Sequence, residues 1–231
     1  MFPLKDDNPS SSAPLVTVAL IVLNALVFVY QISLEVGGAE GARAAQAFIE
    51  EFGLVPCRLT GACRVGPDVP SPILTIFSSM FMHGGLFHIG GNMLYLWIFG
   101  NNVEDTLGHG RYLLFYLLSG IAAALAQTVV GPSSAVPMVG ASGAVSGVLG
   151  AYLILFPGAH VTTLIILGFF FRLVHIPAVI VLGFWIVVQV LNGLGSFGAS
   201  GGVAFFAHIG GFLAGMGLLF VLRPRPRGRL A

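Results

Sequence analysis

The sequence contains a stretch of 111 residues, from Tyr112 to Leu222, that carries a single charged side chain, Arg172. Over the whole chain of 231 residues, 56% are hydrophobic and 8% are charged, whereas an average soluble domain is about 25% charged. One charge cannot keep such a length of surface in water, so we expect most of this chain to lie in lipid. This composition excludes a disordered chain and an ordinary soluble enzyme. The formal net charge is +1, with no basic patch before the C-terminal tail, and no nucleic-acid partner is expected.

Six segments are long and apolar enough to cross the hydrocarbon core of a bilayer, which takes about 20 residues of helix. They are Ala13–Leu34, Leu86–Val103, Tyr112–Val130, Met138–Leu155, Ile176–Leu194 and Val203–Leu222. We therefore predict an all-α membrane protein, a six-transmembrane-helix bundle over residues 13–222. A long outer loop, residues 35–85, joins the first two helices, and the tails are residues 1–12 and the basic residues 223–231. The apolar stretch His160–Phe171 is too short to span and is predicted to be an interfacial or re-entrant link.

The distribution of Lys and Arg predicts the orientation of these spans. With six spans both termini share one side, which carries seven basic residues against three on the other side. Both termini are therefore predicted to be cytoplasmic and the 35–85 loop to lie outside. The lack of an extra span or transit peptide favours a multi-pass protein of a prokaryotic plasma membrane.

Two cysteines, Cys57 and Cys63, fall in the predicted outer loop. In an oxidising compartment a disulfide between them is the expected state, and two free thiols are the alternative. Two such ligands make a poor metal site, so neither a metal nor a cofactor is predicted.

Polar side chains within the spans are the informative residues, because each is costly in lipid and usually pairs or functions. Ser142 on the fourth segment and His208 on the sixth are predicted to lie at similar depth below the outer surface. His88 and Asn92, four residues apart, share one face of the second segment near the same surface. A lone His in an apolar helix is often structural, but three helices here bring polar groups to one layer.

The glycines near these residues have a plainer interpretation as packing positions. Gly143 and Gly147 on the fourth segment, and Gly211 and Gly215 on the sixth, are small enough for two helix backbones to touch. They therefore predict close contact between these two helices.

The chemistry that this layer can support is nucleophilic acyl transfer. A serine hydroxyl needs a base to take its proton, and a neutral imidazole is the usual one, so Ser142 and His208 are the candidate pair. His88, Asn92 and the backbone N–H of Ser142 are candidate donors to the oxyanion that forms on the substrate carbonyl. No acidic residue follows Asp105, so a catalytic dyad is predicted rather than a triad.

At these residues the sequence resembles the rhomboid family of intramembrane serine proteases. The resemblance runs over residues 75–222 and rests on three motifs: FMHGGLFH leading to Asn92, GASG around Ser142, and AHIGG around His208. It implies a nucleophile at Ser142, a general base at His208 and an oxyanion site at His88 and Asn92. It also implies a substrate that is itself a transmembrane segment, unwound near small or helix-breaking residues, with water reaching the site from outside.

The resemblance assigns two further residues structural roles and shows two departures. His83 matches the family's structural histidine before the second helix, and Glu104 matches a buried carboxylate at the cytoplasmic end. The family often has a tyrosine that stacks on the catalytic histidine where this chain has Ser146, so Phe206 and Phe212 are candidate replacements. The Trp-Arg pair common in the family's first loop is absent.

Two other functions fit parts of the pattern. An inactive rhomboid-like protein would bind membrane helices without cutting them, but such proteins lose the nucleophile or the base, and this chain has both. A small transporter could use His83, His88 and His208 along a pathway, but the polar residues gather toward one face of the membrane. The zinc-protease motif His-Glu-x-x-His is missing, and so is any acid for an aspartyl pair in the later helices.

Overall fold

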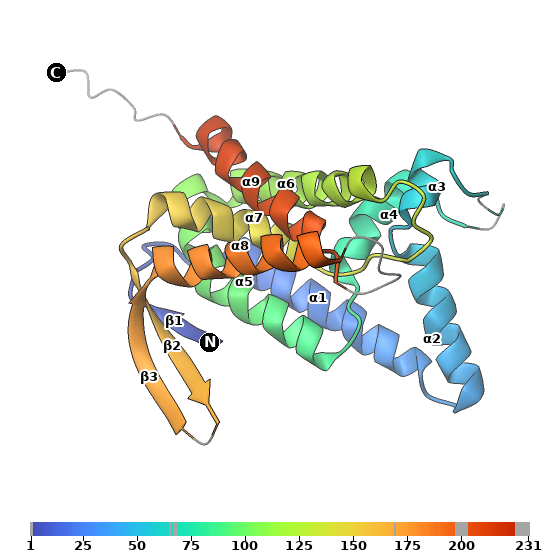
Figure 1. Cartoon of the computed structure of the whole chain (residues 1–231), viewed down its shortest axis with the longest axis horizontal. Helices are drawn as coiled ribbons and strands as arrows, with labels where there is room; N and C mark the ends of the chain where they lie inside the picture. Colours follow the sequence, from blue (N-terminus) through green and yellow to red (C-terminus); the bar gives the residue numbers. More distant parts are fainter. Residues whose placement is uncertain (1, 65, 67–68, 169, 197–202, 225–231) are drawn as a thin grey trace.

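A computed structural model of the chain describes residues 2–64, 66, 69–168, 170–196 and 203–224. Its long helices run roughly side by side as a bundle, with a small sheet at one end and short helices at the other (Figure 1). The helices are α1 (Leu15–Leu34), α2 (Ala39–Phe52), α3 (Pro56–Thr60), α4 (Pro72–Ser78), α5 (Leu86–Leu107), α6 (His109–Val130), α7 (Ser142–Leu155), α8 (Ala178–Gly195) and α9 (Phe205–Leu222). A 3₁₀ turn, η1 (Ser79–Phe81), follows α4, and the strands are β1 (Phe2–Asp6), β2 (His160–Leu167) and β3 (Phe170–Pro177).

Each of the six predicted spans contains a helix, but six full spans are not found in the described residues. Four helices, α1, α6, α8 and α9, are long and apolar enough to cross a membrane. A fifth span results if α4 and η1 are counted with α5, from which they are bent by 82°. The remaining helix, α7, has 14 residues, about 21 Å at 1.5 Å per residue, which is shorter than the bilayer core. The prediction of six spans is therefore corrected to four or five.

The difference in α7 lies at its start, which was predicted at Met138 and falls at Ser142. Met138 instead forms an isolated β-bridge with Leu54 of the 35–85 loop. Gly140 has a φ of 134°, in the region that favours glycine, and its N–H donates to the carbonyl of Ser79 at 2.8 Å. These contacts hold residues 138–141 out of the helix, so Ser142 is the first residue of α7 rather than one inside it.

The core of the bundle is built around α7. Its residues from Gly143 to Tyr152 are all buried, and it packs against α5, α6, α8 and α9. A helix covered on all sides has to be apolar on all sides, which explains why the sequence 143–155 shows no polar face. The buried aromatic side chains of Phe99, Tyr112, Phe115 and Tyr116 fill the half of the core that is farther from Ser142.

The predicted contact of the fourth and sixth segments is found between α7 and α9. A Cβ atom added to Gly211 would overlap with the carbonyl oxygen of Gly143, and one added to Gly215 would overlap with that of Gly147. The two backbones thus touch at positions one helical turn apart, which only glycine allows.

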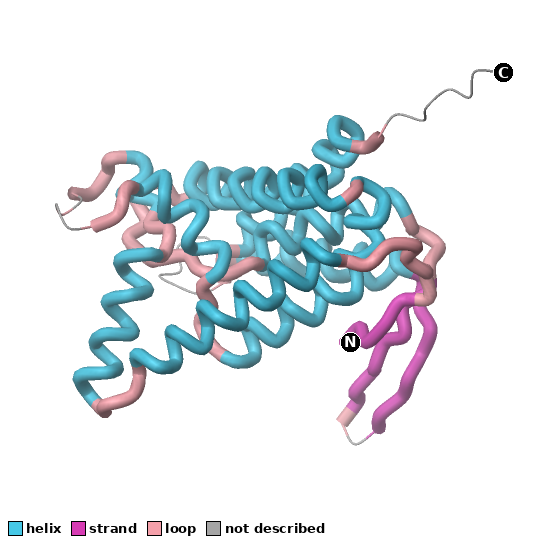
Figure 2. The backbone as a smooth tube through the Cα atoms, turned by 180° about the vertical axis from the view of Figure 1, so that it is seen from behind, coloured by secondary structure: helices cyan, strands magenta, loops and turns pink. Residues whose placement is uncertain are grey.

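The all-α prediction is wrong in one respect, because β1, β2 and β3 form a three-stranded antiparallel sheet in that order. The predicted link His160–Phe171 is one strand and the start of the next. Its β-branched residues, Val161 to Thr163 and then Ile165 and Ile166, favour an extended chain. The sheet projects sideways from the end of the bundle where α7 ends (Figures 1 and 2).

The N-terminal segment, predicted as a tail over residues 1–12, is tied to the bundle. Asp6 is buried and accepts a hydrogen bond from the Tyr152 hydroxyl at 2.6 Å. Ser11 and Ser12 donate to the carboxylate of Asp105. The predicted C-terminal tail lies outside the described residues beyond Pro224.

The loop predicted over residues 35–85 contains α2, α3, α4 and η1. Its two cysteines, Cys57 and Cys63, form a disulfide. Helix α2 lies across the end of the bundle opposite the sheet and is attached to α1 by a ring contact of Phe48 with Tyr30 (Figure 1).

Candidate active site

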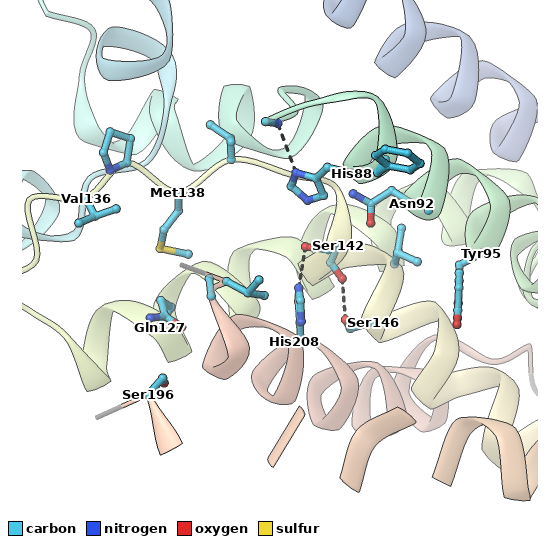
Figure 3. Close-up of a pocket in the computed structure, with 18 of the residues that line it drawn as sticks. His88, Asn92, Tyr95, Gln127, Val136, Met138, Ser142, Ser146, Ser196 and His208 are labelled. Atoms are coloured by element: carbon cyan, nitrogen blue, oxygen red, sulfur yellow. Dashed lines mark hydrogen bonds between the residues drawn. The ribbon is translucent and has the colours of Figure 1, made fainter. Parts of the chain in front are cut away.

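Ser142 and His208 come together from two helices that are far apart in the sequence. Ser142 is the first residue of α7 and His208 lies in the first turn of α9. The Ser142 Oγ is 2.8 Å from the His208 Nε2, which is within hydrogen-bond distance (Figure 3). This distance depends on the glycine contact of α7 with α9, because a wider separation of the backbones would move the two side chains apart.

The other ring nitrogen of His208 contacts a residue that the sequence analysis did not select. Its Nδ1 lies 2.7 Å from the Oε1 of Gln189 on α8, and the Gln189 side chain is buried. Since an amide oxygen only accepts, this contact assigns the proton to Nδ1 and leaves Nε2 free to accept from the serine. The sequence does contain an indication of this role, because a glutamine in an otherwise apolar predicted span is costly unless it pairs with another polar group.

An aromatic residue of α8 occupies the position beside the His208 ring. Trp185, one turn before Gln189, has its ring centroid 5.8 Å from that of His208 at an interplanar angle of 38°. Phe212, a predicted replacement for the family's tyrosine, instead stacks on Trp185 at 6.1 Å. The Ser146 hydroxyl donates to the carbonyl of Ser142 at 2.6 Å and so is bonded within its own helix.

The predicted oxyanion donors lie on α5, on the other side of Ser142 (Figure 3). His88 accepts a hydrogen bond from the N–H of Gly84 at its Nδ1, at 3.3 Å, which assigns the proton to Nε2. A Cβ atom added to Gly140 would lie 2.8 Å from this Nε2 and 3.4 Å from the Ser142 Oγ, so Gly140 lies between these two groups. The Nδ2 of Asn92 is buried and has no hydrogen-bond partner among the described residues.

The start of α7 adds backbone donors to the same place. The first N–H groups of a helix have no partner within the helix and carry the positive end of its dipole. Because α7 begins at Ser142, these groups lie next to the Ser142 hydroxyl. Such a helix end favours negative charge nearby.

His83 lies behind this site rather than in it. Its side chain is 2% exposed, and its ring packs edge-on against His88 with centroids 5.1 Å apart. Gln31 of α1 holds its backbone, accepting from the His83 N–H at 2.9 Å and donating to the carbonyl at 3.2 Å. His83 thus links α1 to the loop that positions His88.

Glu104 lies at the opposite end of the bundle. Its carboxylate is buried and accepts hydrogen bonds from the N–H groups of Val16 and Thr17 and from the Thr17 hydroxyl. It also lies 2.6 Å from the Nδ1 of His109. Glu104 therefore joins the start of α1 to α5 and α6, and it takes no part in the site at Ser142.

A cavity of about 720 Å³ opens beside Ser142. It is bounded by α5, α7, α8, α9 and the loop before α7, and Ser142, His208, His88 and Asn92 all line it (Figure 3). Its deeper wall consists of Tyr95, Val145, Ser146, Leu149 and Trp185. Among the described residues there is no cluster of three or more His, Cys, Asp or Glu side chains that could hold a metal.

Comparison with known proteins places this arrangement in a family. The Rhomboid domain family matches residues 70–225, more than half of the chain, and the chain therefore belongs to the rhomboid family. It is similar to Rhomboid protein 1, mitochondrial, of Saccharomyces cerevisiae, with 37% identity over 103 residues, 41% of this chain and 28% of that protein. It is similar to Rhomboid protease GluP of Bacillus subtilis, with 42% identity over 78 residues, 34% of this chain and 15% of that protein.

The relatives include proteins named as inactive. Inactive rhomboid protein 1 of Papio anubis is 28% identical over 160 residues, 69% of this chain and 17% of that protein. The chain spans less than a third of the length of each of these three relatives. Membership of this family identifies the chain as a multi-pass membrane protein. The relatives include both proteases and inactive proteins.

Proposed function

We propose that this protein is an intramembrane serine endopeptidase that hydrolyses peptide bonds in or near transmembrane segments of other membrane proteins. The observation that carries the proposal is the 2.8 Å contact between the Ser142 Oγ and the His208 Nε2. Neither a helix-binding protein nor a transporter needs a serine and a neutral imidazole in proton-transfer contact beside a cavity.

In the proposed reaction, His208 Nε2 takes the proton of the Ser142 hydroxyl as Oγ attacks the carbonyl carbon of the scissile bond. The oxyanion that forms is stabilised by His88, Asn92 and the backbone N–H of Ser142. The protonated His208 then gives its proton to the leaving amine, and the C–N bond breaks to leave an acyl group on Ser142. Water, deprotonated by His208, attacks this ester and restores the free hydroxyl.

Gln189 is the positioning residue for this base. No acidic residue follows Asp105 in the sequence, so a carboxylate on the later helices is not available to orient His208. The Gln189 amide oxygen at 2.7 Å takes that role, holding the ring in the tautomer whose Nε2 accepts a proton. A neutral amide avoids the cost of burying a charge in the bundle.

The substrate class follows from the place of the site. The cavity lies beside the first residue of α7 and is bounded by membrane helices, so a segment of another membrane protein is the chain that can reach it. An intact helix keeps its carbonyl groups hydrogen-bonded, so the segment has to unwind locally before attack, as small or helix-breaking residues allow. No metal and no cofactor takes part in the proposed reaction.

The proposed orientation counts α7 as a short sixth crossing, so that both termini lie in the cytoplasm and the site lies toward the outer side, following the distribution of Lys and Arg. In this orientation the Cys57–Cys63 disulfide lies in the outer compartment, where such bonds persist. A prokaryotic plasma membrane is the proposed location. The proposed roles of His83 and Glu104 are structural, in line with their contacts at Gln31 and at the start of α1.

The relation to inactive rhomboids supports a second candidate, a protein that binds membrane helices without cutting them. A fluorophosphonate probe separates the two, because it reacts with an activated serine and not with a resting one. We expect labelling and cleavage of a reporter transmembrane substrate by the wild-type protein, and loss of both in Ser142→Ala and His208→Ala. If the folded wild-type protein neither labels nor cleaves, the proposal is wrong and the binding protein is favoured.

A further inference from the structure

The proposed reaction leaves unused the one charged residue of the long apolar stretch. Arg172 lies in β3, between Phe171 and Leu173, and its side chain is exposed. An isolated cation among apolar residues is costly in the middle of a membrane but common at its surface, where the head reaches water and phosphate.

The register of the sheet divides its residues between two faces. Because Ile166 pairs with Phe171, and Leu164 pairs with both Leu173 and Phe2, these five side chains share one face. This face, which we call the apolar face, points away from the bundle, since Phe171 is 68% and Leu173 is 58% exposed. The opposite face carries Val161, Thr163 and Asp6 on the bundle, where all three are buried.

The far end of the sheet exposes aromatic side chains on both faces, and Arg172 lies on the same face as Phe170. Phe170, at the start of β3, lies on the opposite face from Phe171 and is 81% exposed. Soluble proteins rarely leave two such phenylalanines and a leucine open to water side by side, so a partner is expected to cover them.

The attachment of the sheet places it at a membrane surface. β3 ends at Pro177, and α8, a candidate span whose exposed side chains from Val179 to Leu191 are apolar, begins at Ala178 with no linker. The strands project sideways from the helix axes at the end of the bundle where α7 ends (Figure 1), and Ser142 is at the other end of α7. A strand of eight residues covers about 26 Å, so the sheet reaches past the helices along the plane of the bilayer surface.

The charges on the sheet are suited to phosphate. Lys5 and Arg172 are exposed, whereas each of the two nearby acids already accepts a hydrogen bond from another residue. Asp6 is bonded to Tyr152, and Asp7 accepts from the His160 N–H at 2.7 Å. The exposed surface is thus apolar with a basic rim, which is the pattern of an interfacial lipid-binding element.

We propose that the far end of this sheet is seated in the lipid leaflet opposite the active site. Phe170, Phe171 and Leu173 enter the boundary between headgroups and acyl chains, and Arg172 binds lipid phosphates. The partner is the bilayer itself, and the sheet anchors the α7–α8 connection at its surface.

The test uses a single fluorescent label. Cys57 and Cys63 are bonded to each other, so Phe171→Cys provides one free thiol for a bimane label. The full chain is reconstituted in phosphatidylcholine–phosphatidylglycerol vesicles that contain lipids with a nitroxide near the headgroup end of the acyl chain. We expect quenching at this position to exceed that of Ser10→Cys, an exposed site at the same end, by about twofold or more. Val187→Cys, on the exposed side of α8, reports the quenching of a lipid-facing site.

Two further measurements complete the test. Phe170→Cys repeats it at a second position, and the thermal unfolding midpoint checks that each variant is folded. Adding Arg172→Gln to Phe171→Cys should remove the increase in quenching that phosphatidylglycerol produces over phosphatidylcholine alone.

Three results would overturn the proposal. The first is quenching at Phe171→Cys no greater than at Ser10→Cys. The second is quenching at Phe171→Cys that does not respond to phosphatidylglycerol, whether or not Arg172→Gln is also present. The third is energy transfer between labelled copies that rises with the protein-to-lipid ratio, which would assign the apolar face to a second copy of the chain.

Discussion

Replacing Gln189 with leucine tests how a base without a carboxylate partner is held in place. Leucine is close to glutamine in volume, so Gln189→Leu keeps the packing of α8 while removing the oxygen that lies 2.7 Å from the His208 Nδ1. The Nδ1–H then has no acceptor in a buried setting, and the ring is free to adopt the other tautomer, in which Nε2 cannot take a proton.

The size of the effect follows from the cost of an unpaired buried donor, about 1–3 kcal/mol. Since tenfold in rate corresponds to about 1.4 kcal/mol, kcat should fall about 5- to 150-fold. Gln189 is not among the described residues that line the cavity beside Ser142, so KM should change little. Gln189→Glu keeps an acceptor oxygen at the same place and should retain more activity than Gln189→Leu.

The assay is cleavage of a reporter transmembrane substrate in vesicles over a range of substrate-to-lipid ratios, which separates kcat from KM. Val187→Ala is the matched control, because it shortens an apolar side chain on the same helix at a position that is 53% exposed. The thermal unfolding midpoint of each variant shows that the bundle is intact. An unchanged kcat in folded Gln189→Leu would refute the positioning role, and an equal loss in Val187→Ala would assign the effect to α8 as a whole.

Three other changes test the remaining parts of the site and the fold. Asn92→Ala removes a candidate oxyanion donor and should lower kcat about 10²- to 10³-fold, and unchanged turnover would remove Asn92 from that role. Gly215→Ala places a methyl group on the carbonyl of Gly147 and should lower the free energy of unfolding in detergent by about 1–3 kcal/mol, whereas Gly217→Ala, with open space around it, should not. Burial raises the pKa of Asp6, so the folded protein holds a proton that the unfolded chain releases, and the unfolding midpoint should decrease as pH rises through this raised pKa. Scanning fluorimetry carried upward in pH from the ordinary aspartate pKa of 3.8 should show a smaller slope for Asp6→Asn, and equal slopes would contradict this account.

The helices that meet at the site were predictable from the sequence because lipid imposes a simple rule on them. A helix that crosses a membrane shows as a run of apolar residues, and a polar residue within such a run stands out. Ser142 and His208 could be selected in this way, and their glycine neighbours indicated that the two helices touch. The same rule applies to Gln189, which is also a polar residue in an apolar run, the fifth predicted span.

The start of α7 and the sheet could not be predicted in this way, because both depend on partners that are distant in sequence. The loop before Ser142 is held by Leu54 and Ser79, more than 60 residues earlier. The stretch His160–Phe171 is apolar enough for either a helix or a strand, and pairing with residues 2–6 is what decides between them. Hydropathy measures how readily a segment enters lipid, but it does not report which backbone the segment pairs with.

The pairing of β1 with β2 has a consequence for how the protein is made. Residues 2–6 leave the ribosome well before their hydrogen-bonding partners at 161–164, which follow only after most of the helices. At roughly 5–20 residues per second, translation alone imposes a wait of about 8–30 s. Before its partners are made, Asp6 lacks the hydrogen bond from the Tyr152 hydroxyl. The edge of β1 is then open to any extended peptide nearby. Closing the sheet is thus a late step of biogenesis, and a fusion partner attached next to β1 would act on assembly at that step rather than on chemistry at Ser142.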